Sequence, residues 1–323
     1  LPNIVDKFLY GNIIPKCQSL ILRSSQNGIF LHTLFTTINK LNHSFFYKEE
    51  LIDSLFETFK DYFFPSNSEN DLCFGSFSQI VKNCKNKKKL YNKLLETEFD
   101  TDKNNYYNYV ICYIVDILEE KNQKIKKLFT KEEIIKGVVY ILKNFEKCYM
   151  QEYNDKYEHL FEKLTNSLIT SEIDVDASIE DDLKSSLSEA IVDLISNNEY
   201  SNYLCYIYSI ASLLIYKYNI ALNDNSSLSD QVSGLIKDTS KEINPTTIRN
   251  LIPLVSLGIS IFGVEDNQDI IDILTLISES KFVLENFNTL SNINAFFLYI
   301  ITKQLIVYEK IKDTSSDFAY KVL

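Results

Sequence analysis

The chain has 323 residues, of which 45% are hydrophobic and 24% charged, and its formal net charge at pH 7 is −11. This composition is that of a globular protein with ample apolar material for a core, and it excludes an intrinsically disordered chain. At roughly 150 residues per domain, the length corresponds to about two domains or to one elongated helical array.

Glycine and proline are scarce, with seven and five residues respectively. Because these residues build turns, hairpins and phosphate-binding loops, their scarcity predicts an all-α fold. We expect about fourteen helices, arranged either as an irregular α-solenoid or as two packed helical bundles. The glycines are isolated, so the sequence contains neither a P-loop nor a dinucleotide-binding fingerprint.

The clearest amphipathic helices are predicted over 48–64 and 131–148. The segments 46–62 and 129–145 share a Lys-Glu-Glu sequence and the same apolar spacing, at a constant offset of 83 residues. This match indicates either a duplicated helical hairpin or a coincidence between two amphipathic helices in a biased composition. The sequence leaves both interpretations open and favours the second.

Six cysteines occur without any C-x-x-C pair, which excludes zinc fingers and C-x-x-C redox motifs. Cys73 and Cys84 flank a short polar to helical stretch and form the one pair whose placement suggests a disulfide. Cys112 and Cys205 lie in apolar runs, so we expect buried thiols there. The cysteine usage slightly favours an intracellular, reducing compartment over a secretory one and does not decide between them.

Two groups of lysines lie in the first half of the chain. Such groups can dock onto an anionic lipid surface, a polyanion or an acidic partner, but solvated helix faces are the favoured interpretation. The candidate contact residues are Lys82, Lys85, Lys87, Lys88, Lys89, Lys93, Lys124, Lys126 and Lys127, with Lys121, Lys131 and Lys136 close by.

Arginine is almost absent, since only Arg23 and Arg249 stand among the 33 basic residues. This skew is typical of coding in an AT-rich genome. Because bidentate contacts to guanine and phosphate depend on arginine, sequence-specific nucleic-acid binding is not expected.

Two helix starts carry local signals. Thr130 and Glu133 have the spacing of a capping box at the start of the 131–148 helix. Pro245 stands at the first position of a later helix, where its missing N–H has no intrahelical role. We expect Pro253 to break or kink that helix. A further long helix is predicted over 291–312.

The polar segment 171–182 is the predicted domain boundary, and a second polar gap is predicted over 221–230. Residues 1–170 contain 23 basic and 22 acidic side chains, whereas residues 171–323 contain 10 and 22. The chain therefore divides into a near-neutral N-terminal helical domain and a strongly acidic C-terminal helical domain. The acidic residues of the 171–182 segment do not complete an EF-hand loop, and we predict that this segment is a solvated linker.

An uncharged run of 14 residues occupies 203–216. A membrane span needs roughly 20 apolar residues, so we predict a central helix buried on all sides and no transmembrane span. The tyrosines of this region form either an aromatic surface for a partner or a cap over the core whose hydroxyls reach water. They are Tyr200, Tyr203, Tyr206 and Tyr208.

No catalytic, cofactor-binding or metal-ligating residue is predicted. The three histidines are far apart in sequence and match no metal-binding or catalytic motif: His32, His43 and His159. Two glycosylation sequons start at Asn42 and Asn225, in predicted loops, and they permit secretion without supporting it. The chain begins at Leu1, which we interpret as a processed or trimmed start that hides any signal peptide.

The function favoured by these observations is a non-enzymatic helical module for protein–protein interaction, acting as a scaffold or as an assembly subunit. A secreted or surface-exposed helical ligand or adhesin stays open because of the even cysteine count and the two sequons. A membrane-active helical protein also stays open, using the apolar runs 203–216 and 251–264 with the lysines on a membrane surface.

Overall fold

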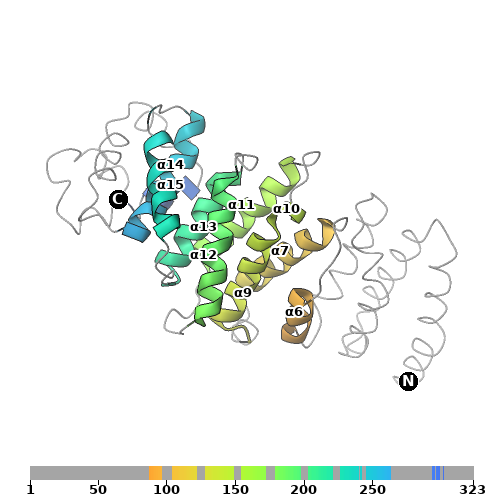
Figure 1. The fold of residues 1–323 in the computed structure, drawn as a ribbon. Coiled ribbons are helices and arrows are strands. Elements are labelled where there is room, and N and C mark those ends of the chain that lie inside the picture. Colours follow the sequence, from red (N-terminus) through yellow and green to blue (C-terminus); the bar gives the residue numbers. More distant parts are fainter. Residues whose placement is uncertain are drawn as a thin grey trace, which may run out of the picture. The chain divides into compact units, whose positions relative to one another are not determined.

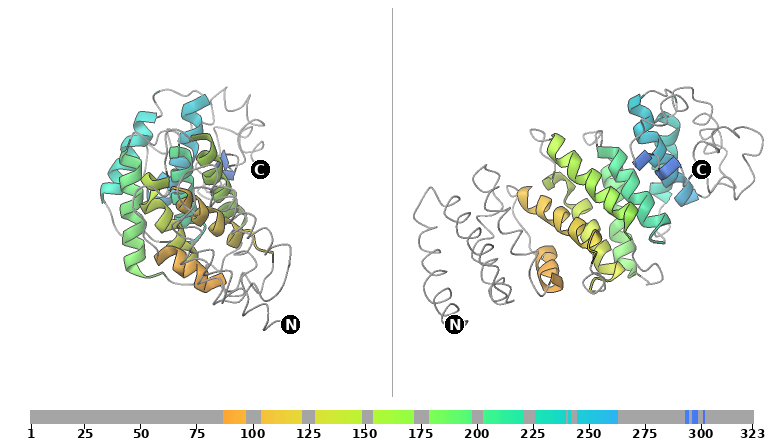
Figure 2. Two further views of the ribbon diagram at one scale, coloured as in Figure 1. Left: turned by 90° about the vertical axis from the view of Figure 1, so that its right-hand side faces the viewer. Right: turned by 180° about the vertical axis from the view of Figure 1, so that it is seen from behind.

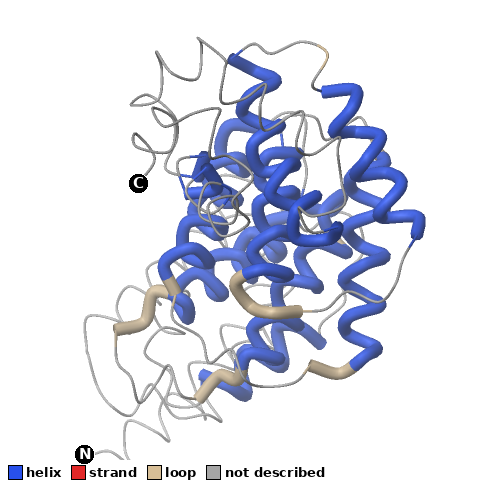
Figure 3. Tube along the Cα trace, turned by 90° about the vertical axis from the view of Figure 1, so that its left-hand side faces the viewer, coloured by secondary structure: helices blue, strands red, loops and turns tan. Residues whose placement is uncertain are grey.

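The computed structural model describes residues 87–96, 104–121, 128–148, 154–171, 179–197, 203–220, 226–239, 241, 245–262, 293, 294, 296–298 and 301. Within these residues the regular secondary structure consists of nine helices, with no strand (Figures 1 and 3). The predicted all-α fold is therefore confirmed for this part of the chain. The predicted total number of helices, the helix at 48–64 and the meaning of the 83-residue offset concern residues outside it and stay predictions.

The chain divides into two compact units. One comprises Leu1–Tyr113 and Glu146–Glu152, and the other comprises Ile114–Phe145 and Tyr153–Leu323. The boundary predicted at 171–182 from charge and polarity stays a prediction.

The described residues of the first unit belong to three helices. They are α6 (Lys87–Glu96), the beginning of α7 (Asn104–Leu118) and the end of the short α10 (Phe145–Cys148). Tyr91 of α6 and Tyr113 of α7 are buried, and their rings stack with centroids 6.1 Å apart. An aromatic contact therefore joins these two helices.

The second unit holds the larger part of the described structure, and in it the helices form two series. Helix α11 packs against α13 and α13 against α15, while α9 packs against α12 and α12 against α14 (Figure 2). Contacts of α12 with α13 and of α14 with α15 connect the series. The bounds are α9 (Lys131–Lys143), α11 (Asn154–Thr170), α12 (Asp181–Ser196), α13 (Leu204–Tyr216), α14 (Ser226–Thr239) and α15 (Pro245–Phe262).

Polar contacts show the relative direction of the helices in the α11, α13, α15 series. Near the N-terminal ends, Tyr206 of α13 contacts Glu158 of α11, a separation of 48 residues. At the C-terminal ends, Lys217 contacts the carbonyl of Leu168, 49 residues away. Arg249 of α15 contacts Tyr206 at a separation of 43 residues. Helices α11 and α13 therefore run parallel, and α15 begins beside the start of α13.

Helix α9 begins with the predicted capping box. The Glu133 backbone N–H donates to Thr130 Oγ1 at 3.2 Å, and the Thr130 backbone N–H donates to Glu133 Oε2 at 2.9 Å. The expected single helix over 131–148 is wrong, because α9 ends at Lys143 and α10 begins at Phe145. The interruption lies at Asn144, whose backbone N–H and side-chain amide both donate to the Tyr140 carbonyl, at 3.1 and 2.8 Å.

Helices α13 and α15 form the apolar centre of the second unit. Every residue from Cys205 to Leu214 is buried, which confirms the predicted central helix at 203–216. In α15 the residues from Leu251 to Ile259 are buried in the same continuous way. Burial of each large aliphatic side chain contributes about 1.5–3 kcal/mol, so the apolar residues of these two helices contribute strongly to the stability of the unit.

Helix α15 begins at Pro245, as predicted, but it does not break at Pro253 and continues to Phe262. An internal proline removes one backbone hydrogen bond and costs about 3 kcal/mol. The residues that follow it, Leu254, Val255 and Leu257, are completely buried. Their combined burial exceeds that cost, so the helix is maintained through the proline.

Two helices begin inside segments that were expected to be polar gaps. Helix α12 starts at Asp181, within 171–182, and α14 starts at Ser226, within 221–230. Carboxylates in a first helical turn interact favourably with the helix dipole, and Asp181 also pairs with Lys184 at 2.7 Å. In α14, apolar residues recur every four positions and are buried: Leu228, Val232 and Ile236. Residues 181–182 of the first segment and 226–230 of the second are therefore helical.

Part of the predicted helix at 291–312 lies within the described residues. Ile293, Phe297 and Ile301 are helical and buried, at the four-residue spacing that predicted one apolar face.

Candidate functional site

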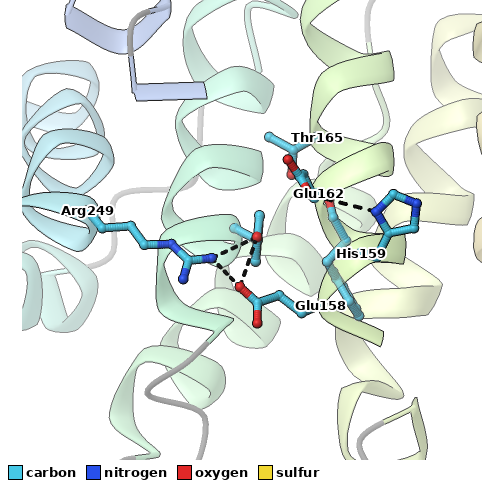
Figure 4. Close-up of polar contacts among 7 residues, drawn as sticks. Glu158, His159, Glu162, Thr165 and Arg249 are labelled. Atoms are coloured by element: carbon cyan, nitrogen blue, oxygen red, sulfur yellow. Dashed lines mark hydrogen bonds and ion pairs between the residues drawn. The ribbon is translucent and has the colours of Figure 1, made fainter. Parts of the chain in front are cut away.

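Three polar side chains meet near the N-terminal ends of α11, α13 and α15. Glu158 Oε1 accepts hydrogen bonds from the hydroxyl of Tyr206, at 3.2 Å, and from Nη2 of Arg249. The same Nη2 also donates to the Tyr206 hydroxyl oxygen at 2.7 Å. Figure 4 shows Glu158 and Arg249 pointing toward each other across the space between their helices. We call the set Glu158, Tyr206 and Arg249 the polar rung.

The polar rung is half-buried. Tyr206 is only 4% exposed, whereas the side chains of Glu158 and Arg249 are 30% and 41% exposed. The Arg249 guanidinium carbon lies 5.4 Å from the centre of the Tyr206 ring, within the range of a cation–π interaction. The ring therefore fills the interior between the helices, while the two charged ends reach water.

The electrostatics of the rung keep Tyr206 and Arg249 in their ordinary protonation states. Burial raises the pKa of Tyr206, against the opposing effect of Arg249. Burial lowers the pKa of Arg249, but the hydrogen bond to Glu158 and the neighbouring groups outweigh it, so the net shift is upward. The tyrosine therefore stays a neutral donor and the arginine a cation.

The thiol of Cys205 lies next to Tyr206 on α13 and is 2% exposed. Burial raises its pKa to about 11, against a smaller lowering by Arg249. A thiol needs a lowered pKa and access to its target to act as a nucleophile, so Cys205 is unsuited to that role. It is the buried apolar thiol that the sequence predicted.

His159 and Glu162 lie on α11 but outside the rung, with His159 directed away from Arg249 (Figure 4). The distance from His159 Nδ1 to Glu162 Oε2 is 3.8 Å, and the imidazole is 76% exposed. The described residues contain no group of three histidine, cysteine, aspartate or glutamate side chains that could hold a metal ion. What the arrangement can do is hold three helices together through charge-assisted hydrogen bonds.

A second polar cluster joins the opposite ends of α11 and α13. Lys217 Nζ donates to the carbonyl oxygens of Leu168, Ile169 and Ser171 at 2.8, 2.5 and 2.6 Å. The Tyr218 hydroxyl donates to the Leu168 carbonyl at 2.8 Å and lies 2.6 Å from Ser171 Oγ. Either hydroxyl can be the donor in that contact, because the Ser171 hydroxyl also lies 3.2 Å from the Leu168 carbonyl oxygen. We call Lys217 and Tyr218, with the carbonyls they bind, the carbonyl clamp.

The backbone at the end of α13 places the clamp. The Tyr218 backbone N–H bonds to the Leu213 carbonyl, and that of Ile220 bonds to the Leu214 carbonyl, so the last turn is wider than an α-helical one. Asn219 adopts a left-handed conformation with φ 49°. Asparagine tolerates this region better than most residues, and it reverses the chain so that Ile220 is buried beside the helix.

The structure describes only part of the predicted lysine groups. Lys87, Lys88, Lys89 and Lys93 lie on α6, where Lys89 is exposed and Lys88 and Lys93 are half-buried. Lys121 and Lys136 are exposed, and Lys136 pairs with Glu132 at 2.6 Å. Lys131 is 4% exposed, so its expected solvated position is wrong; it begins α9, where the chain packs against the core. The remaining candidates lie outside the described residues: Lys82, Lys85, Lys124, Lys126 and Lys127.

The aromatic surface considered for the 203–216 region is wrong for the described tyrosines. Tyr203, Tyr206 and Tyr208 are each at most 4% exposed, because α13 is surrounded on all sides. Tyr203 packs edge-on against Phe145 and Phe161, with ring centroids 5.4 and 5.7 Å apart. These rings belong to the core and are not available to a partner.

The other predicted site residues lie outside the described part of the chain. They are Cys73 and Cys84 of the suggested disulfide, the sequon residues Asn42 and Asn225, and Tyr200. Cys112 is half-buried, so the fully buried thiol expected there is wrong, whereas Cys205 is buried as expected.

The comparisons with known proteins identify no relative: no family model, curated protein or solved structure matches this chain. None of the helices among the described residues is long and apolar enough to cross a membrane.

Sequence reasoning missed both clusters. Arg249 was noticed as one of two arginines, and Tyr206 as a member of an apolar run, but their contact joins residues 43 positions apart. A charged arginine directly ahead of an apolar stretch is a signal that such a residue has a partner inside the fold.

Proposed function

We propose that this protein is a non-enzymatic helical scaffold that binds a protein partner, with helical hairpins stacked along the chain as an α-solenoid. The observation that carries the proposal is how the polar rung and the carbonyl clamp use their polar groups. The hydrogen bonds of the rung and of the clamp connect helices to one another. Neither cluster presents a reactive group to solvent. A binding surface requires helices that hold a constant arrangement, and it does not require catalytic residues.

The spacing of the contacts supports the stacked hairpins. Hydrogen bonds between successive helices of the α11, α13, α15 series join residues 43 to 50 positions apart, at both ends of α11 and α13 and between α13 and α15. In the other series, Lys143 of α9 contacts Ser186 of α12 at a separation of 43 residues, and Ser196 of α12 contacts Gln231 of α14 at a separation of 35. Arrays of stacked helix pairs repeat every 40–47 residues or so. The 83-residue offset between 46–62 and 129–145 is close to twice this spacing.

Helix α12 offers a way to test partner binding without disturbing the core. Glu189 and Asp193 are exposed on it, whereas Leu187, Ile191 and Leu194 are buried. Exposed charges steer association and set its specificity, so charge reversal at this face changes binding and leaves the packing intact. A control exists at the C-terminal end of α14, where Asp238 pairs at 2.6 Å with Lys241, two residues beyond the helix, and the two charges can be exchanged.

The experiment is native co-purification of the full chain from its source, with mass spectrometry of the retained proteins and light scattering of the complex. We expect one partner that is retained by the chain and by the control Asp238→Lys/Lys241→Asp. Loss of that partner in Glu189→Lys/Asp193→Lys would place the contact on α12. A chain that elutes as a monodisperse monomer and retains no specific protein contradicts the proposal.

A further inference from the structure

The C-terminal end of α11 has the character of a cation site. Helix C-termini carry a partial negative charge, and their last carbonyl oxygens have no donor within the helix. Here the carbonyls of Leu168, Ile169 and Ser171 converge on one point, where Lys217 Nζ lies within 2.8 Å of all three oxygens. The ammonium group has three donors, and each of them meets one of these oxygens.

We propose that these three carbonyls form a monovalent-cation site that the chain fills with its own ammonium group. A ring of backbone carbonyls that replaces a hydration shell is the arrangement by which proteins bind potassium. The clamp has the same donor chemistry, and Lys217 supplies the cation from the end of α13. The positive charge is thus attached covalently to the chain. The contact between the ends of α11 and α13 therefore does not depend on the ions in solution.

The surroundings of the clamp fit this assignment. Tyr218 and Ser171 are 1% and 3% exposed, so the oxygens are shielded on that side. The Tyr218 hydroxyl donates to the Leu168 carbonyl, which fixes that oxygen toward the cation. The ammonium also lies 5.5 Å from the centre of the Tyr218 ring, a second feature that favours a positive charge.

The test is rescue of Lys217→Ala by free cations. We expect the thermal midpoint of this variant to fall by roughly 4–8 °C in tetramethylammonium chloride, whose cation is too large for the site. Ammonium or potassium chloride at the same ionic strength should restore about half of the loss, because an ion that binds only the folded state stabilises it. The wild type and Lys241→Ala, which removes an exposed lysine, correct for general salt effects.

Lys217→Met provides the second arm, because its side chain keeps the stem of the lysine and leaves no space for an ion. No selective rescue is expected for it. The proposal is overturned if Lys217→Ala responds to the salts as Lys241→Ala does, or if Lys217→Met is rescued equally.

A measurement on the intact chain covers the case in which Lys217→Ala does not fold. Reductive methylation followed by peptide mass spectrometry reports how readily each lysine loses its proton and reacts. We expect Lys217 to be modified at least tenfold more slowly than Lys237 and Lys241, which are exposed. Equal reactivity of Lys217 and Lys241 would show that the ammonium is not held by the carbonyls and would refute the site.

Discussion

Replacing Tyr206 with phenylalanine removes one hydroxyl from the polar rung and keeps the ring. That hydroxyl donates to Glu158 at 3.2 Å and accepts from Arg249 at 2.7 Å. Hydrogen bonds to charged groups contribute about 1.5–3 kcal/mol each, but exposed ion pairs contribute only about 0–1 kcal/mol. Because Glu158 and Arg249 are 30% and 41% exposed, both regain water after the substitution. We therefore expect the free energy of unfolding to fall by about 1–2 kcal/mol.

Tyr208 on the same helix is the matched control. It is 2% exposed, its pKa is raised by burial alone, and its hydroxyl makes no hydrogen bond in the described part of the chain. The substitution breaks no hydrogen bond within the described residues, so Tyr208→Phe should leave the free energy of unfolding unchanged or slightly raised. Urea unfolding followed by circular dichroism measures both variants. The reasoning fails if Tyr206→Phe is as stable as the wild type, or if Tyr208→Phe loses as much.

Three further changes test the helix ends and the buried groups. Asn219→Gly should keep the stability within a few tenths of a kcal/mol, whereas Asn219→Val should lower it by about 1–2 kcal/mol in the same urea assay, because β-branched residues disfavour φ 49°. Pro253→Ala should raise the free energy of unfolding by about 1 kcal/mol, since it restores the backbone hydrogen bond that α15 lacks. Burial raises the pKa of Cys205 from 9.0 to about 11. The folded state therefore holds the thiol proton of Cys205 more tightly than the unfolded state does. The stabilisation that results is complete below pH 9 and is lost as the pH rises to about 11. Cys205→Ala should flatten the stability profile over that interval.

The helices could be predicted from the sequence wherever a local signal had no competitor. The capping box at Thr130 and Glu133 fixed the start of α9, and the proline at 245 fixed the start of α15. The uncharged run that became α13 was identified as a buried helix because it is too short for a membrane and has no polar face. Each of these inferences used residues within one or two turns of each other.

The errors arose where two local effects opposed each other. Asn144 has a moderate helix propensity, but its side chain bonds to the Tyr140 carbonyl, and the helix ends there. Pro253 was expected to break or kink its helix, and only the break is contradicted, because burial of the residues around it preserves α15. Which effect dominates depends on tertiary packing, which the local sequence does not specify.

The polar rung and the carbonyl clamp could not be predicted because the residues in contact are at least 43 positions apart, and as many as 91 for Glu158 and Arg249, and share no motif. Lys217 binds backbone carbonyls, which every residue has. The side chain of Ile169, for example, therefore gives no indication in the sequence that its carbonyl binds Lys217. The rung joins side chains of three different types, one on each helix, so no repeated residue marks it in the sequence. The packing of the helices decides which positions meet, and residues of quite different chemistry can form the contact there.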